Sequence, residues 1–212
     1  MSPMFLRWFN RLILALTATV IPATFLYAAH TCCADTPPHV SLVGQLLIAS
    51  PEIRDPHFDH AVVLVVHHDR AGAMGIVINV PRVKMPLAQI LKLIGETDTD
   101  VKGEVQVFAG GPVQPEVGFI IHSADYRRPE TRDVNGSVLM TSNSQIIRDI
   151  SRDEGPKKSI IAFGYTGWAA GQLEDELGRR VWFTTPGDQN LIFYETREKL
   201  WETAYARRSQ DL

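Results

Sequence analysis

The stretch AVVLVVHHDRAGAMGIVIN, residues 61–79, decides the fold class of this chain. Its first part, residues 61–67, is a β-branched apolar run that is typical of a buried central strand. A polar turn that ends in glycine, residues 68–72, leads into a second apolar segment at residues 74–79. Two such segments around a short turn predict a β-hairpin, so the centre of the fold is expected to be antiparallel.

Short apolar segments separated by turn residues continue on both sides of this hairpin. Further strands are predicted at residues 43–49, 105–109, 118–122, 159–163 and 181–184. Helices are predicted from apolar spacing at residues 86–94, 142–155, 169–177 and 195–207. The second of these begins with a capping-box pattern, Ser142 and Gln145.

The connections between these segments decide how the strands pair. Several of them are too short for the crossover of a dozen or more residues that parallel strands require. The sequence therefore predicts an α+β class, with a single domain built on a mixed, mostly antiparallel sheet that is curled and flanked by helices.

Composition narrows the class of function. The chain has 212 residues, of which 45% are hydrophobic and 21% charged, which suits one domain with a sizeable core. The formal net charge is −3, and residues 1–29 hold two arginines and no acid, so the rest of the chain carries −5. An acidic body is a poor match for a phosphate backbone, and we expect no nucleic-acid partner.

The cysteine and histidine patterns argue against a metal or a cofactor. Cys32 and Cys33 are adjacent, and neighbouring cysteines rarely pair with each other, so the domain is expected to hold no disulfide and no thiol nucleophile. His67 and His68 lie at a strand end, where adjacent side chains point to opposite faces and cannot easily share one ion. No HExxH or paired Cys/His motif occurs. We expect no metal and no cofactor.

The N-terminal segment, residues 1–35, has the layout of an export signal. A positively charged start precedes an uncharged apolar stretch, residues 12–29, and then small residues. Pro22 disfavours an uninterrupted helix, which favours a cleaved signal over a membrane anchor. Residues 36–42 would then link this segment to a domain at 43–208. We expect a periplasmic protein or one anchored in the inner membrane by this segment; the alternative is a cytoplasmic protein whose translation starts later.

The segment GYTGWAAGQLEDEL, residues 164–177, holds the densest set of candidate binding residues. Three glycines flank two aromatic residues where a strand is expected to pass into a helix, and open α/β sheets place ligand clefts at such junctions. The candidates there are Tyr165, Trp168, Gln172 and Glu174. The alternative is a structural turn, in which the glycines permit the bend and Trp168 fills the core.

Asp55 and His122 complete the set of candidates for a site that binds an unidentified protein or small molecule. Asp55 precedes Pro56, which is more typical of an aspartate that organises a turn. His122 precedes Ser123, but a catalytic triad is defined by geometry, and no GxSxG motif occurs. Convergence of Asp55, His122 and Glu174 in one pocket would favour a hydrolase-like enzyme. Their dispersal would favour a non-catalytic binding or regulatory module, which we expect because no catalytic motif is complete.

Two further glycine-rich stretches, residues 72–75 and 110–112, have neither the GxGxxG nor the GxxxxGK[ST] pattern of phosphate-binding loops. We expect their glycines to provide positive φ angles or a close approach of two backbones.

Taken together, these segments resemble the YqgE/AlgH family of uncharacterised bacterial proteins, also called UPF0301. The matching stretches are GQLLIASPEIRDPHF, GAMGIVIN, GGPV, GFIIH and GYTGWAAGQLEDEL, followed by Trp182. They run in order from Gly44 to about Trp201, and their joint occurrence is specific although each alone is weak. The resemblance implies an α+β domain whose sheet folds into a partial barrel. It implies no established catalytic activity, substrate or cofactor.

The sequence departs from the family pattern in two places. The family usually reads Asn-Arg-Pro after the glycine-rich hairpin, whereas this chain reads Asn79-Val80-Pro81, so any role of that arginine is absent. The family also mostly lacks an export signal. AlgH-like proteins have been proposed as transcriptional regulators, but an exported protein does not act on transcription directly.

Overall fold

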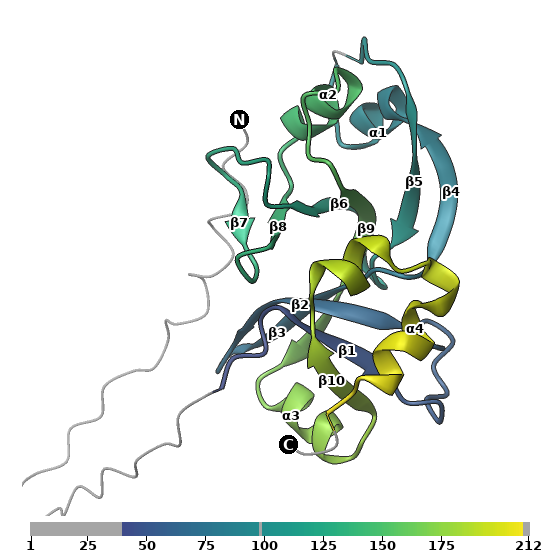
Figure 1. The fold of residues 1–212 in the computed structure, drawn as a ribbon, viewed down its shortest axis with the longest axis vertical. Coiled ribbons are helices and arrows are strands. Elements are labelled where there is room, and N and C mark those ends of the chain that lie inside the picture. The colour runs from purple at the N-terminus through teal and green to yellow at the C-terminus, as the bar shows by residue number, and fades with distance from the viewer. Residues whose placement is uncertain (1–39, 98, 210–212) are drawn as a thin grey trace, which may run out of the picture. The chain divides into compact units, whose positions relative to one another are not determined.

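The computed structural model describes residues 40–97 and 99–209, and Figure 1 shows their arrangement. The predicted signal or anchor at residues 1–35 lies outside the described residues, as does most of the linker predicted at 36–42. The strands are β1 (Gln45–Ala49), β2 (Val62–Asp69), β3 (Gly72–Val77), β4 (Pro81–Pro86), β5 (Glu104–Ala109), β6 (Val113–Ser123), β7 (Arg132–Asp133), β8 (Val138–Thr141), β9 (Ser159–Ala169) and β10 (Trp182–Pro186). The helices are α1 (Leu87–Leu93), α2 (Gln145–Ser151), α3 (Gln172–Gly178), the π-helical turn η1 (Asn190–Tyr194) and α4 (Arg197–Ala206).

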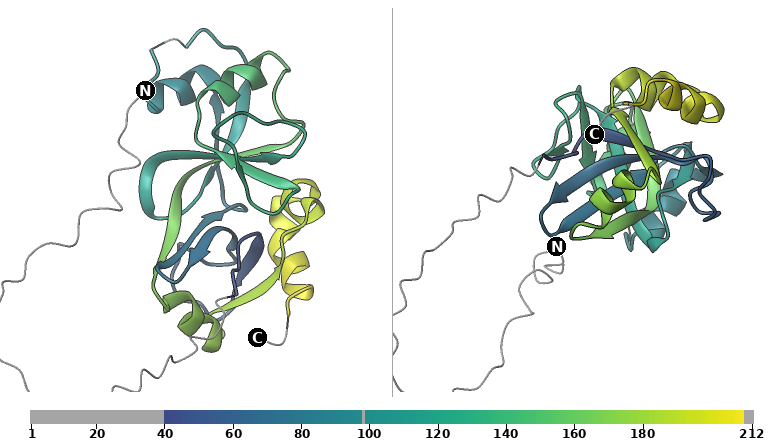
Figure 2. Two further views of the ribbon diagram at one scale, coloured as in Figure 1. Left: turned by 90° about the vertical axis from the view of Figure 1, so that its left-hand side faces the viewer. Right: turned by 90° about the horizontal axis from the view of Figure 1, so that it is seen from below.

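The strands form one curled sheet. Its order is β10-β1-β2-β3-β9-β6-β8-β7, and β4 is joined to β9 through β5. The only parallel pair described is β5 with β9, and the remaining pairs are antiparallel. Helix α4 packs against β1, β2 and β10, while α1 and α2 pack together at the far end of the sheet (Figure 2). The predicted α+β domain with a mixed, mostly antiparallel sheet is confirmed, as is the partial barrel that the resemblance implied.

Strand β9 belongs to both halves of the sheet. Its first part pairs with β5 and β6, and its last part pairs with β3. Between them Gly164 has a φ of +79°, which permits the bend. A Cβ on Gly110 would lie 2.2 Å from the carbonyl oxygen of Gly164, and one on Gly164 would lie 2.3 Å from that of Gly111. The expected close approach of backbones at residues 110–112 is therefore confirmed.

The bend at Gly164 overturns one prediction. We expected a turn in residues 164–168 and a helix from residue 169, but β9 continues to Ala169 and α3 begins only at Gln172. The glycine lets the strand change direction without ending. Gly171, with a φ of +74°, makes the actual junction with the helix.

Three other details of the predicted fold differ from the structure. Ser142 does not cap α2, which begins at Gln145; the side-chain oxygen of Asn143 accepts the hydrogen bond of the Gln145 N–H at 2.8 Å. Strand β4 was not predicted, because the alternation of Val83 and Met85 with charged residues is short, flanked by prolines and largely exposed. The last helix starts at Arg197, after the separate turn η1.

The core next to the predicted site contains two of the tryptophans. Trp168 of β9 and Trp182 of β10 pack in one apolar cluster with Leu47, Val63 and Leu173.

No helix in residues 40–97 and 99–209 is both long enough and apolar enough to span a membrane.

Candidate functional site

A cleft of about 380 Å³ lies beside the start of α3. We call it the tryptophan cleft. It is formed by the loop after β1, the start of β6, the end of β9, and the segments around α3 and β10. Its lining residues are Ile53, Asp55, Phe58, Pro112, Val113, Thr166, Gly167, Trp168, Gln172, Glu176, Val181 and Trp182. Three of the six predicted site residues, Asp55, Trp168 and Gln172, are thus brought together.

Glu176 organises the cleft, and sequence reasoning did not select it. Its Oε2 accepts hydrogen bonds from the indole Nε1 of Trp168 at 2.9 Å and of Trp182 at 2.8 Å. Its Oε1 accepts one from the side-chain amide of Gln172 at 2.9 Å. One carboxylate thus joins β9, β10 and the first turn of α3. Because three N–H groups already donate to it, this carboxylate acts as an anchor.

The helical phase of α3 explains why Glu176 and Gln172 act together. Residues four apart lie on the same face of a helix, so the two side chains meet. The Oε1 of Gln172 also accepts the N–H of Ala169 at 3.0 Å, which ties the helix start to β9. The signal that could have found this pair is the i, i+4 spacing of Gln172 and Glu176.

The aromatic rings form one wall of the tryptophan cleft. Trp182 meets Trp168 edge to face at 6.0 Å between centroids and meets Phe58 in the same way at 5.4 Å. Trp168 is only 7% exposed and Trp182 only 3%. Trp168 is therefore mainly a core residue, and only its rim contributes to the cleft, so the structural alternative describes most of this side chain.

Asp55 lies at the edge of the cleft and also organises its own loop. Its Oδ1 accepts the backbone N–H of His57 at 2.9 Å and lies 2.9 Å from the Nδ1 of that ring. These hydrogen bonds from His57 hold the pKa of Asp55 below its ordinary value. The expected turn-forming aspartate is confirmed, and its carboxylate is exposed beside the cleft.

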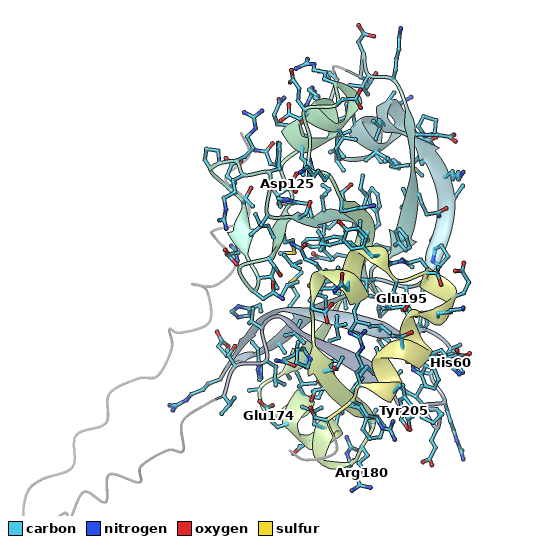
Figure 3. All side chains as sticks on the ribbon, viewed as in Figure 1. His60, Asp125, Glu174, Arg180, Glu195 and Tyr205 are labelled. Atoms are coloured by element: carbon cyan, nitrogen blue, oxygen red, sulfur yellow. The ribbon has the colours of Figure 1, made fainter. Side chains whose placement is uncertain are left out.

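Glu174 points away from the tryptophan cleft. Its Oε1 accepts a hydrogen bond from the Nε2 of His68 at 2.9 Å, and the Nδ1 of His68 accepts the N–H of Leu42 at 3.0 Å. His68 is buried whereas His67 is exposed, which confirms that the two histidines face opposite sides of the sheet. Figure 3 shows Glu174 on α3.

Tyr165 also lies outside the set of residues that line the cleft. Its ring packs against the core cluster on the other side of the sheet and meets Phe119 edge to face at 6.1 Å. Alternation along β9 explains this, because Thr166 and Trp168 face the cleft and Tyr165 lies on the opposite face.

His122 is buried far from the cleft. It pairs in register with Ser159 at the start of β9, whereas Trp168 lies nine residues further along that strand, or roughly 30 Å if it were straight. The Nδ1 of His122 bonds to the Ser123 carbonyl at 3.0 Å, and the Nε2 has no partner among the described residues. Burial lowers the pKa of His122, which favours the neutral form of its ring.

A second polar cluster lies near His122, and sequence reasoning missed it. The buried carboxylate of Asp149 accepts hydrogen bonds from Tyr126 at 2.7 Å, Gln145 at 2.8 Å and Arg128 at 2.5 Å. Burial alone would raise the pKa of Asp149, but these hydrogen bonds outweigh it and lower the pKa. The cluster fixes the loop after β6 onto α2.

Within residues 40–97 and 99–209 no three His, Cys, Asp or Glu side chains are grouped to hold a metal ion.

Comparisons with known proteins agree on one family. The family model described as AlgH-like matches residues 46–212. A UPF0301 protein of Xanthomonas euvesicatoria is 40% identical over 172 residues, covering 81% of this chain and 91% of that protein. A UPF0301 protein of Thioalkalivibrio sulfidiphilus is 39% identical over 173 residues, covering 81% of this chain and 92% of that protein.

Two solved structures are similar. The solution structure of the AlgH protein from Pseudomonas aeruginosa matches with a TM-score of 0.66 and 34% identity, covering 80% of this chain and 92% of that one. A crystal structure of a protein from Corynebacterium diphtheriae matches with a TM-score of 0.60 over 79% of this chain and 87% of that one. Its 16% identity makes this second match a likeness of fold alone.

Proposed function

The chain belongs to the AlgH-like family, and on that premise we propose that its domain is a non-catalytic binding module whose ligand contacts the tryptophan cleft. The observation that carries this proposal is the state of Glu176. Its carboxylate accepts two indole N–H groups and one amide N–H, whereas a general base needs a lone pair directed at the substrate's proton.

The distribution of the other ionisable candidates supports a binding role. Asp55 lies at the cleft, and Glu174 bonds to His68 on another face of α3. His122 is buried on β6, opposite the start of β9. A hydrolase-like mechanism would need these groups within hydrogen-bond reach of one substrate atom. These three groups therefore do not form a nucleophile–base pair with one another.

The composition of the cleft suits recognition of a small molecule or of a side chain from a partner protein. Its aromatic and aliphatic wall is combined with two exposed polar groups, the carboxylate of Asp55 and the amide of Gln172. Binding pockets typically join an apolar lining to a few polar groups that fix orientation. Trp168 and Trp182 are held in place by Glu176, so the wall is rigid before a ligand arrives.

We also propose that this module works outside the cytoplasm. The support is the sequence of residues 1–35, with its charged start and apolar stretch. A ligand or partner would then be met in the periplasm or at the inner-membrane surface.

The proposal can be tested by NMR on the purified mature protein, titrated with fractions of a cell extract. A ligand of the cleft should shift the indole N–H signals of Trp168 and Trp182. The indole of Trp201 is an internal control, because it donates to the carbonyl of Ala49 and does not line the cleft.

Variants connect these shifts to the cleft. Gln172→Ala is expected to weaken binding by roughly tenfold, the loss of one or two hydrogen bonds. Arg179→Ala, at an exposed residue directly after the same helix, should leave binding unchanged. Ligand-induced shifts that persist unchanged in Gln172→Ala would contradict the proposed site. Turnover of a bound compound that His122→Asn abolishes would contradict the non-catalytic role.

A further inference from the structure

A second cleft, of about 300 Å³, lies where β5 and β9 diverge. The two strands pair only from Val107 to Ala109 and from Ile161 to Phe163, and the residues before these positions separate. Figure 1 shows η1 and α4 beside this part of the sheet. We call this the arginine cleft; the residues that matter for the argument are Gln106, Phe108, Lys158, Ile160, Phe193 and Arg197.

The lining of the arginine cleft is cationic. Arg197 and Lys158 line it, and no acidic side chain does. This contrasts with the rest of the protein, because residues 30–212 carry a formal charge of −5. A local concentration of positive charge in an acidic domain needs a physical explanation.

Arg197 is a partly buried cation whose hydrogen bonds, among the described residues, all go to neutral carbonyl groups. Its Nη1 donates to the carbonyl of Ile78 at 3.2 Å, and its Nη2 donates to the carbonyls of Ile192 at 2.7 Å and Glu195 at 3.0 Å. Within the part of the chain that the structure describes, its guanidinium forms no ion pair. Three of the five donors of a guanidinium are thus used, all on carbonyls.

The acids nearest to Arg197 do not neutralise it. Both carboxylate oxygens of Glu195 are engaged elsewhere, one by the N–H of Thr196 at 2.9 Å and one by the hydroxyl of Thr203 at 3.0 Å. Glu198 is exposed to solvent. Figure 3 shows Glu195 at the junction of η1 and α4. Burial lowers the pKa of Arg197 by more than the charges of Glu195 and Glu198 raise it, so these two acids compensate the cation only in part.

Buried charges in proteins are normally paired, because desolvation is costly without a counter-charge. Arg197 is also the first residue of α4, where the helix dipole is unfavourable for a cation. An anion in the arginine cleft would offset both costs. The planar guanidinium suits phosphate or carboxylate oxygens, and Lys158, whose Nζ lies 4.8 Å from the centroid of the Tyr194 ring, adds a point charge.

From these contacts we propose that the arginine cleft binds the phosphate or carboxylate group of a small molecule. Phe108, Phe193 and Ile160 give the cleft an apolar wall beside the two cations, so the ligand carries an apolar body next to its anionic group. This site is separate from the tryptophan cleft, with which it shares no lining residue.

The test is calorimetric titration of the mature protein with four probes: phenyl phosphate, benzoate, inorganic phosphate and phenol. Saturable binding of phenyl phosphate or benzoate, tighter than that of inorganic phosphate and weakened by salt, is expected; phenol should not bind. The relative affinities of phenyl phosphate and benzoate distinguish a phosphorylated from a carboxylated ligand.

Neighbouring lysines provide a matched pair of variants. Lys158→Ala removes an exposed side chain that rests on Tyr194, so the fold should be retained, and it is expected to weaken binding by roughly tenfold. Lys157→Ala removes another exposed lysine, one that does not line the cleft, and the affinity should change by less than about twofold. Arg197→Lys keeps the charge but loses the planar fork, so it should also weaken binding.

Three results would overturn this inference: no saturable binding of any anionic probe at millimolar concentration, unchanged affinity in Lys158→Ala, or an equal loss in both lysine variants. Asp55→Asn should leave anion binding unchanged, so failure here is distinguishable from failure of the tryptophan cleft.

Discussion

Replacing Glu176 by alanine gives a direct measure of how the two tryptophans are held. The change removes the acceptor of both indole N–H groups, on rings that are 7% and 3% exposed. A buried donor left without a partner costs about 1–3 kcal/mol. The two indole donors together would cost about 2–6 kcal/mol. Because Glu176 itself is half-buried, water can reach part of the space that its side chain leaves, which reduces this cost. We therefore expect a loss of about 3 kcal/mol in the free energy of unfolding.

Urea unfolding followed by far-UV circular dichroism measures this loss. With a slope of about 2 kcal/mol per molar urea, the midpoint should fall by about 1.5 M. Glu176→Gln retains one acceptor oxygen for the indoles but turns an amide N–H₂ group towards that of Gln172, so about half of the loss is expected. Asp175→Ala, an exposed carboxylate on the same helical turn, is the control and should change stability by less than about 0.5 kcal/mol.

The reasoning would be refuted if Glu176→Ala unfolded at the same urea concentration as Asp175→Ala. It would also be refuted if Glu176→Gln were as unstable as Glu176→Ala, because the loss would then not depend on an acceptor oxygen.

Four further predictions concern stability, processing and partners. Trp168→Ala should lose about 3–5 kcal/mol in the same assay, because the ring fills the core; a loss below about 1 kcal/mol would contradict this. Burial lowers the pKa of His122 from its ordinary value of 6.5, so the unfolded chain binds this proton more readily and the folded state loses stability as the pH falls through 6.5. His122→Leu should reduce this loss of stability between pH 7.5 and 5.5, measured as the change in the urea midpoint. An unchanged dependence of the midpoint on pH would contradict the role of His122. N-terminal sequencing should place the start of the mature protein between Ala29 and Asp35; an intact Met1 on a soluble cytoplasmic protein would exclude export. Residues 40–212 should give no salt-sensitive, sequence-selective shift of DNA in a mobility assay, and such a shift would disprove the inference from charge.

The central hairpin could be predicted because its signals are local. Residues 61–67 and 74–79 are apolar runs around a short turn, and the structure forms β2 and β3 from them. Strand β9 could not be predicted past Gly164, because glycines at 164, 167 and 171 are typical of a turn. The continuation depends on the backbone of Gly110 and Gly111, which lies against Gly164 and leaves room only for a glycine.

The site could be predicted only in part, for a similar reason. The segment 164–177 contributes Trp168 and Gln172 to the cleft as expected, but the choice between Glu174 and Glu176 depends on partners elsewhere in the chain. Glu176 bonds to Trp182 on β10, and Glu174 bonds to His68, 106 residues earlier. Helical spacing shows that the two carboxylates lie on different faces of α3, but it does not show which of them meets the tryptophan indoles.

The pairing of β1 has a consequence for biosynthesis. Its neighbours are β2, which follows directly, and β10, whose Pro186 lies opposite Gln45. β3 likewise needs the last residues of β9 as its second neighbour. A ribosome must therefore complete almost the whole chain before the sheet can close, and pairings between such distant segments form slowly. A nascent chain that remains open until it is released is also one that a translocation channel, which passes unfolded polypeptides, can still accept.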